Sequence, residues 1–253
     1  MLQAVEYLGK VGIGITGPEF FRGDDNKTYV VKRSNNYIGK HVLVSEFIAA
    51  NFGKKLFLPF PNSNIILLDK FMNSEKSFSN IGFASEYIYN AQYANNENIL
   101  QAINFKQLAG IILFDHFFQN ADRTNNRKNL LIAKRENNQY IYGIDHSHLF
   151  KTGRWDKETL TKNSDQIKVY SNYIYGILLR HHLEVMDFSP YIEAFKNLSD
   201  SDIDEILNLI PYQWLDDISL KDALFQFITK RRCLIHEIVE VILNFRYIKT
   251  TYG

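Results

Sequence analysis

Cysteine and net charge are both scarce in this sequence, and each shortage excludes a class of protein. The single thiol, Cys233, cannot support an internal disulfide framework, and its helix-like surroundings predict a buried side chain. With 29 basic and 28 acidic residues, the formal net charge is +1. No overall field therefore draws the chain to nucleic acid or to a membrane surface, and we do not expect a nucleic-acid partner.

Long hydrophobic runs are also missing. No stretch approaches the roughly 18 apolar residues that a membrane span needs, and the first ten residues, MLQAVEYLGK, lack a basic leader of the signal-peptide kind. We therefore expect a cytoplasmic protein without a membrane partner. At 253 residues and 45% hydrophobic content, the chain can bury a sizeable core, as one large domain or two lobes.

Strand-like segments dominate the first part of the chain. The glycine-punctuated stretch from Val5 to Phe21 predicts a β-hairpin, and a second hairpin follows with its turn at residues 24–26. A helix is expected over His41 to Phe52, ended by Gly53, and a strand over Asn64 to Leu68. The aromatic, small-residue stretch from Ser77 to Ala91 suits a connector between two lobes.

Helical patterns dominate the rest. Two short strands, at 129–134 and 139–144, interrupt a series of expected helices: Ile99–Phe118, Ile167–Glu184, one starting at Asp187 with Pro190 in its first turn, Ser199–Leu209, and Ser219–Phe245. Strands first and helices second predict an α+β fold in two lobes. We place a β-rich lobe at residues 1–90 and a mainly helical lobe at residues 91–253.

The densest polar stretch lies in FDHFFQNADRTNNRKNLLI, residues 114–132. An apolar helix-like segment leads into a loop with Asn120, Asp122, Arg123 and Asn129, and the chain then returns to an apolar strand. A second carboxylate, Asp145, follows the next strand. A loop between two buried elements is a common way to present reactive groups on a rigid scaffold. The pattern predicts a base at the loop and a metal ligand at the strand end.

Two charged residues upstream also stand out. Lys32 continues an apolar strand, and Glu46 lies close to the buried face of the following helix. Because both charges would be costly to bury alone, we expect an ion pair, with a strand-end lysine and a rim glutamate as the plainer alternative. The glycines at 9, 12, 14 and 17 could cover a phosphate, although they lack the pattern of a P-loop and could form only a hairpin.

This ordered set of groups suits phosphoryl transfer, which depends on positioning and charge neutralisation. A lysine held by a glutamate can bind nucleotide phosphates, a loop aspartate can accept the proton of an attacking hydroxyl, and amide and carboxylate oxygens suit Mg²⁺. We do not expect zinc at His146 and His148, because further ligands at the usual spacing are lacking. The basic cluster at 230–232 predicts a solvated helix face.

The same segments resemble the HipA-like kinases, a bacterial branch of the protein-kinase and phosphatidylinositol-kinase-like fold. The resemblance covers roughly residues 5–150 and is most specific in NADRTNNRKNLLI and in YGIDHSHLF. It implies an ATP- and Mg²⁺-dependent kinase that phosphorylates a hydroxyl, of serine or threonine in a protein substrate, and that works beside an antitoxin or regulatory partner.

The resemblance also implies a role for each matching residue. Asp122 corresponds to the catalytic base, and its neighbour Arg123 belongs to the same segment, where we favour a structural role in steadying the loop. Asn129 and Asp145 correspond to the metal ligands. The nucleotide would be held by the phosphate lysine with its partner, by a covering loop, and by a hinge within residues 83–87: Lys32, Glu46, Gly14, Thr16, Gly17, Ser85, Glu86 and Tyr87.

Two departures from protein kinases keep other functions open. Protein kinases place the metal asparagine five positions after the catalytic aspartate, where this chain has Arg127, and Asn129 lies seven positions after. Asn125 and Asn126 are also near. In addition, Asp145 is followed by His146 instead of phenylalanine and glycine. A nucleotide-binding pseudokinase and a small-molecule or lipid kinase are therefore alternatives.

Overall fold

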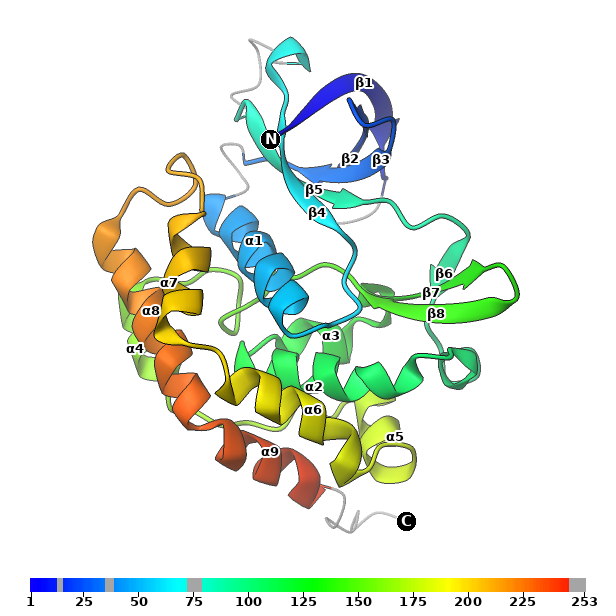
Figure 1. The fold of residues 1–253 in the computed structure, drawn as a ribbon, viewed down its shortest axis with the longest axis vertical. Helices are drawn as coiled ribbons and strands as arrows, with labels where there is room; N and C mark the ends of the chain where they lie inside the picture. Colours follow the sequence, from blue (N-terminus) through cyan, green and yellow to red (C-terminus); the bar gives the residue numbers. More distant parts are fainter. Residues whose placement is uncertain (13–15, 35–38, 72–78, 246–253) are drawn as a thin grey trace.

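A computed structural model describes residues 1–12, 16–34, 39–71 and 79–245, and shows an α+β fold. Five strands close into a barrel in the order β1-β2-β3-β5-β4. Their bounds are Leu2–Lys10 (β1), Glu19–Gly23 (β2), Thr28–Lys32 (β3), Ser63–Leu67 (β4) and Ile81–Glu86 (β5). In Figure 1 the barrel lies at one end of the molecule, next to α1, and the remaining helices form the other end.

Alternation of side chains along the strands fills the barrel. Phe21, Val31, Ile66 and Ala84 point inward and belong to a separate small hydrophobic cluster, as the two-residue period of a strand requires. The hairpin between β2 and β3 turns at Asn26, whose φ of 61° is left-handed, a conformation that asparagine tolerates. Closure pairs both edges of the sheet, because β1 also pairs with β4.

Helix α1 (Lys40–Lys55) packs against the main core. It continues past Gly53, so the expected stop at this glycine was wrong. A Cβ at this position would lie 2.3 Å from the ring of Phe60. Gly53 therefore permits close packing of the loop before β4 and does not end the helix.

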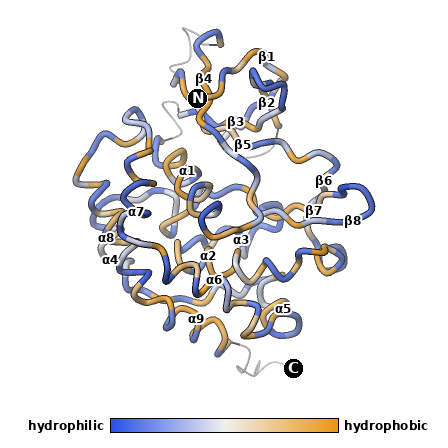
Figure 2. Tube along the Cα trace, viewed as in Figure 1, coloured by the Kyte–Doolittle hydropathy of each residue, from blue (hydrophilic) through white to orange (hydrophobic). Residues whose placement is uncertain are grey.

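Helix α2 (Leu108–Phe117) is the central helix of the larger part, and all ten of its residues are buried. Figure 2 shows hydrophobic residues along most of its length. Around it lie α3 (Ala121–Asn125), a sheet of β6 (Ala91–Tyr93), β7 (Leu130–Arg135) and β8 (Asn138–Gly143), and the helices α4 (Lys157–Asn163), α5 (Tyr173–His181), α6 (Val185–Lys196), α7 (Asp200–Asn208), α8 (Ile218–Cys233) and α9 (Ile235–Asn244). Within the described ranges, no helix has the length and hydropathy to cross a membrane.

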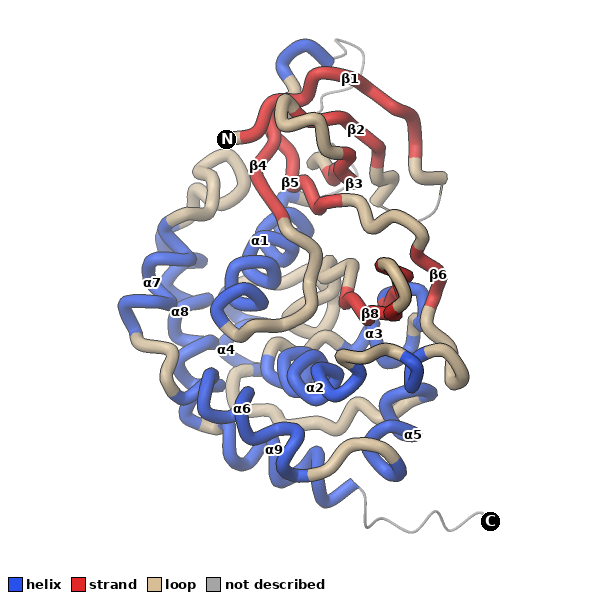
Figure 3. Tube along the Cα trace, turned by 45° about the vertical axis from the view of Figure 1, so that its right-hand side comes forward, coloured by secondary structure: helices blue, strands red, loops and turns tan. Residues whose placement is uncertain are grey.

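The expected connector was partly wrong. Residues 81–86 form β5, which pairs with both β3 and β4 in the barrel. The link to the second part is therefore short, from Tyr87 to Asn90. It is seen in Figure 3 as the loop that descends from β5 to β6. The start of the predicted connector, residues 77 and 78, lies outside the described residues.

Two expected helices are much shorter than predicted, because their backbone groups bond to other elements. Before α2 there are only two 3₁₀ turns, Ile99–Gln101 and Phe105–Gln107, and the N–H of Ile103 donates to the carbonyl of Gln139 at β8. Before α5, the N–H of Tyr170 donates to Nε2 of His116. Both contacts satisfy the backbone outside a helix.

The last helices also differ in detail. Helix α6 starts at Val185, because Glu184 and Asp187 form a capping box, and Pro190 lies inside the helix instead of in its first turn. The expected final helix is in fact two helices, α8 and α9, divided at Leu234. Ser199 and Asp202 form a capping box at the start of α7.

The predicted buried thiol was wrong. Cys233 is exposed, because it lies off the buried stripe of α8.

Candidate active site

A cavity of about 590 Å³ lies between the barrel and the β7–β8 strands, a volume that suits a small-molecule ligand. Its lining includes eight of the residues that the sequence singles out: Thr16, Lys32, Glu46, Ser85, Glu86, Tyr87, Asn129 and Asp145. Much of the remaining lining is apolar, with Val11, Val30, Phe83, Leu131 and Ile144 among it. Of the expected loop residues, Gly17 is described with a φ of 56° and is exposed, whereas Gly14 lies outside the described residues.

Lys32 connects two parts of the site. Its Nζ is 2.5 Å from Oε1 of Glu46 and 2.8 Å from Oδ1 of Asp145. Lys32 is adjacent to Val31, which points into the barrel, so the alternation of β3 turns the lysine toward α1 and the cavity. The predicted ion pair between Lys32 and Glu46 is present, and Asp145 joins it.

The charges of this cluster support one another. Burial alone would lower the pKa of Lys32, but Glu46 and Asp145 outweigh it and raise that pKa above its ordinary value. Burial would raise the pKa of both carboxyls, and the lysine instead holds the pKa of Glu46 and of Asp145 below the ordinary range. All three groups are therefore charged at neutral pH.

Asp145 follows β8 with a left-handed φ of 55°. Its Oδ1 accepts hydrogen bonds from Lys32, from the hydroxyl of Ser147 at 2.7 Å and from the N–H of Ser147 at 3.3 Å. Within the described ranges, these contacts all fall on Oδ1. They leave Oδ2 as an anionic oxygen beside the cavity.

Asp122 and Asn129 come together although seven positions separate them in the chain. The Nδ2 group of Asn129 donates to Oδ2 of Asp122 at 2.6 Å, and the turn Arg127–Asn129 places the amide there. Asn125 bonds to the carbonyl of Ala121 and to Asn172, so its amide is directed elsewhere. Asn126 lines the cavity and caps the same turn.

Arg123 lies beneath this loop and is fully buried. Its Nε donates to Asp115 at 2.9 Å, and its Nη1 donates to the carbonyls of Asn129 at 2.7 Å and Ile144 at 2.5 Å. One guanidinium thus ties the backbone just before β7 to the backbone just before Asp145. This geometry is that of a positioning residue, in line with the structural role that we favour for it.

Asp115 anchors this support, although it belongs to none of the motifs that predict the site. It accepts hydrogen bonds from Arg123, from Asn120 at 3.0 Å and from the hydroxyl of Tyr175. Burial and the nearby carboxylate raise the pKa of Tyr175 well above its ordinary value. A carboxylate within an otherwise buried apolar helix is itself a signal, because it needs a partner there.

The oxygen donors beside the cavity fit Mg²⁺. Asn129 offers an amide oxygen and Asp145 a carboxylate oxygen, and hard divalent cations prefer such ligands. Across residues 1–12, 16–34, 39–71 and 79–245, no group of three His, Cys, Asp or Glu residues could hold a metal. A magnesium site here would therefore complete its coordination with phosphate oxygens and water, as is usual at kinase sites.

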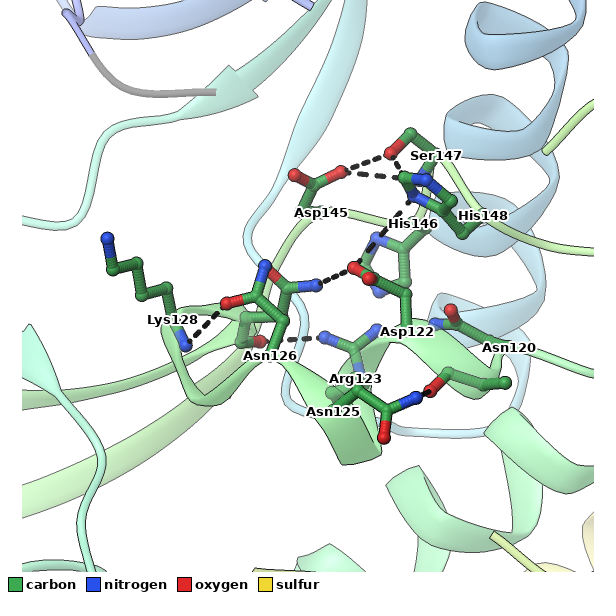
Figure 4. A network of polar contacts seen from close by, with 12 residues as sticks. Asn120, Asp122, Arg123, Asn125, Asn126, Lys128, Asp145, His146, Ser147 and His148 are labelled. Atoms are coloured by element: carbon green, nitrogen blue, oxygen red, sulfur yellow. Dashed lines mark hydrogen bonds and ion pairs between the residues drawn. The ribbon is translucent and has the colours of Figure 1, made fainter. Parts of the chain in front are cut away.

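Figure 4 shows one further group at this site. Nδ1 of His148 lies 3.0 Å from the hydroxyl oxygen of Ser147 and 3.8 Å from Oδ2 of Asp122. His148 is close to half exposed, whereas Ser147 is buried. The sequence pattern predicts no role for Ser147, and for His148 it raises only the zinc site that the missing ligands exclude.

The fold and this arrangement of groups are those of a kinase, and a sequence comparison identifies the family. The model of the HipA-like kinases matches residues 4–232, and the chain therefore belongs to that family. This confirms the resemblance found in the sequence. No curated protein sequence matches the chain.

Solved kinase structures share the fold. The proinflammatory kinase CtkA of Helicobacter pylori superposes with a TM-score of 0.59 at 14% identity, over 97% of each chain. The Golgi casein kinase with Mn and ADP bound gives 0.50 at 11% identity, over 96% of this chain and 72% of that one. HipA of Shewanella oneidensis MR-1, in its complex with HipB and operator DNA, gives 0.48 at 11%, over 98% and 68%. At these identities the likeness to CtkA and to the Golgi casein kinase concerns the fold alone.

Proposed function

We propose that the protein is an ATP- and Mg²⁺-dependent kinase that transfers the γ-phosphoryl group to a hydroxyl, of serine or threonine in a protein substrate. The observation that carries this proposal is the contact of Lys32 with both Glu46 and Asp145 at the wall of the cavity. In this proposal residues 1–90 and 91–253 act as the two lobes of one kinase domain. Ser85 and Glu86 at the end of β5 and Tyr87 at the start of the link would contact the nucleotide base.

The residues of the chain have distinct tasks in this reaction. Lys32, fixed by Glu46, neutralises phosphate oxygens, and Thr16 and Gly17 belong to the loop above them. A bound Mg²⁺ supplies positive charge to the phosphates, and Asn129 and Asp145 would hold it. Such positioning and charge neutralisation account for most of the catalysis in phosphoryl transfer.

Asp122 serves as the base. Its Oδ2 is engaged by Asn129, which leaves its other oxygen to accept the hydroxyl proton of the substrate. As that proton moves to Asp122, the hydroxyl oxygen forms a bond to the γ-phosphorus, and the bond to the bridging oxygen of ADP breaks. Arg123 contributes by holding the backbone of Asn129 and of Ile144.

The family resemblance is the ground for one further part of the proposal, a regulatory or antitoxin partner, whereas the cytoplasmic location stays an expectation from the sequence pattern. The complex with HipB and operator DNA is one of the Shewanella protein.

The decisive experiment incubates the purified protein with γ-labelled ATP and Mg²⁺, with and without a cell lysate. Asp122→Ala and Asp145→Ala are the test variants, and Asp222→Ala, at an exposed position of α8, is the matched control. We expect label on a protein with the wild type and the control, and none with either test variant.

The other outcomes separate the alternatives. Stabilisation by ATP without any labelled product would indicate a pseudokinase. A labelled metabolite beside unlabelled protein would indicate a small-molecule kinase. Full activity of Asp122→Ala would contradict the role of this base.

A further inference from the structure

Four polar side chains form a continuous line across the site, from the proposed base to the proposed metal ligand. Asp122, His148, Ser147 and Asp145 follow one another, with separations of 3.8 Å, 3.0 Å and 2.7 Å between the contacting atoms. Figure 4 shows these side chains directed toward one another. The two middle members have no task in the function proposed above.

Counting protons along this line determines the direction of each hydrogen bond. Asp145 is ionised, so its Oδ1 can only accept, and the hydroxyl of Ser147 must donate to it. A serine hydroxyl has one proton, so Ser147 Oγ can only accept from Nδ1 of His148 at 3.0 Å. The neutral imidazole of His148 is therefore the Nδ1–H tautomer, with its lone pair on Nε2.

The direction of these bonds determines which oxygen of Asp145 is available. Lys32, the hydroxyl of Ser147 and the N–H of Ser147 all bind Oδ1. Three donors on one oxygen prevent the carboxylate from rotating and keep Oδ2 beside the cavity. Partners of this kind orient metal-ligating carboxylates in other proteins.

We propose that Ser147 and His148 are positioning residues of the kinase site: His148 orients the hydroxyl of Ser147, and Ser147 holds Asp145 with Oδ2 directed to the metal. Asp122 Oδ2, at 3.8 Å from Nδ1 of His148, lies beyond hydrogen-bond distance and is a neighbour of this bonded pair. The metal-related half of this inference rests on the proposed function, whereas the tautomer of His148 is independent of it.

The first test needs no ligand. ¹⁵N NMR of the purified protein, at a pH where the imidazole is neutral, reports which ring nitrogen of His148 carries the proton. We expect the Nδ1–H tautomer in the wild type and its loss in Ser147→Ala, because free histidine favours Nε2–H. An Nε2–H tautomer in the wild type would overturn the inference.

The second test measures Mn²⁺ binding in the presence of ADP by electron paramagnetic resonance of the free ion. Ser147→Ala should weaken Mn²⁺ binding about tenfold, within the range found for residues that orient metal ligands. His148→Phe should have a smaller effect of the same sign. His148→Asn, whose amide places an N–H near the position of Nδ1, should restore binding. The exposed His181 of α5 provides the matched control His181→Asn.

Thermal unfolding of every variant checks that the variant still folds. The outcomes of the Mn²⁺ measurement separate the positioning role of Ser147 and His148 from the proposed kinase function. Wild-type binding with unchanged affinity in Ser147→Ala would overturn the positioning role alone. Failure of the wild type to bind Mn²⁺ with ADP would overturn the proposed function and the metal-related half of the inference together, and would leave the NMR result standing.

Discussion

At the scale of single residues, the site depends on charges that are buried in pairs. Lys32 and Glu46 could be predicted from the sequence, because each charge conflicts with an apolar surrounding unless the other is near. Tyr175 and Ser147 could not, because Tyr175 bonds to Asp115, 60 positions earlier in the chain, and Ser147 bonds to Asp145, two positions earlier within an irregular segment. Residue type alone does not distinguish such groups from ordinary polar residues.

Loss of Lys32 should be costly for stability as well as for nucleotide binding. Lys32→Met leaves the buried Glu46 and the partly buried Asp145 without their cation, and we expect a loss of about 3 kcal/mol in the free energy of unfolding. The double variant with Glu46→Gln should recover part of it. Urea denaturation measures both. Lys27→Met is the control, because the exposed pair of Lys27 with Glu86 should contribute about 1 kcal/mol or less.

His116 should make stability depend on pH. Its Nδ1–H donates to the carbonyl of Ile112, and its Nε2 accepts a hydrogen bond from the N–H of Tyr170. A second proton on the ring would be placed at Nε2, where it would face the N–H of Tyr170. Burial, assisted by Arg231, lowers the pKa of His116 to about 4. Between pH 6.5 and 4 the unfolded chain therefore binds the proton and the folded protein does not, so stability falls as pH falls.

The contribution of His116 to this fall is on the order of 3 kcal/mol. Denaturation of the wild type and of His116→Gln at several pH values isolates it, because the other carboxyl and histidine groups titrate in both proteins. The stability difference between the two should change across this window. A constant difference would show that His116 does not carry the effect.

At the scale of elements, α1 is held by the segment after Asp145. Trp155 Nε1 donates to the hydroxyl of Ser45 at 3.2 Å, and its ring stacks on His41 at 4.4 Å. Ser45 and His41 both belong to α1, which contributes Glu46. The segment that follows the proposed metal ligand thus helps to place the glutamate that holds Lys32.

Trp155→Phe should loosen α1 and lower phosphoryl transfer. We expect a loss of about 1 kcal/mol for the removed hydrogen bond and faster hydrogen exchange of the amides in α1. Trp214→Phe is the matched control for the hydrogen bond, because Trp214 also packs on α1, against Phe47, but its Nε1 has no hydrogen-bond partner among the described residues. Equal exchange of α1 in the two variants would argue against this role of Trp155.

Hydrophobic period predicted the existence of most elements but not the ends of several. The hairpins, α1, α7 and the β7–β8 pair could be predicted from local pattern and capping. The helices expected over Ile99–Phe118 and Ile167–Glu184 form only in part, as α2 and α5. Ahead of α2, Asn104 bonds to both backbone groups of Ile141, and ahead of α5, Thr124 bonds to the carbonyl of Asn172. Tertiary hydrogen bonds of this kind compete with a helix and are invisible to periodicity.

At the scale of the whole molecule, the cavity joins the barrel to the β7–β8 strands, so a ligand there should stabilise both parts. ATP with Mg²⁺ at 100 times its dissociation constant should raise the free energy of unfolding by about 2.7 kcal/mol. Thermal unfolding with ATP, with and without EDTA, separates the nucleotide from the metal. Asp145→Ala should lose the part that depends on Mg²⁺, and an unchanged metal effect in that variant would contradict its assignment as a ligand.

The position of Arg231 in α8 affects when, during synthesis of the chain, the proposed kinase site can be completed. This buried arginine donates to the carbonyls of His116 and Phe117 at the end of α2, and to that of Gln166. The end of α2 leads directly into the loop with Asp122. On the ribosome that loop is made more than a hundred residues before Arg231, so the proposed base emerges well before its anchor. We therefore expect the proposed kinase activity to begin only after α8 has been made.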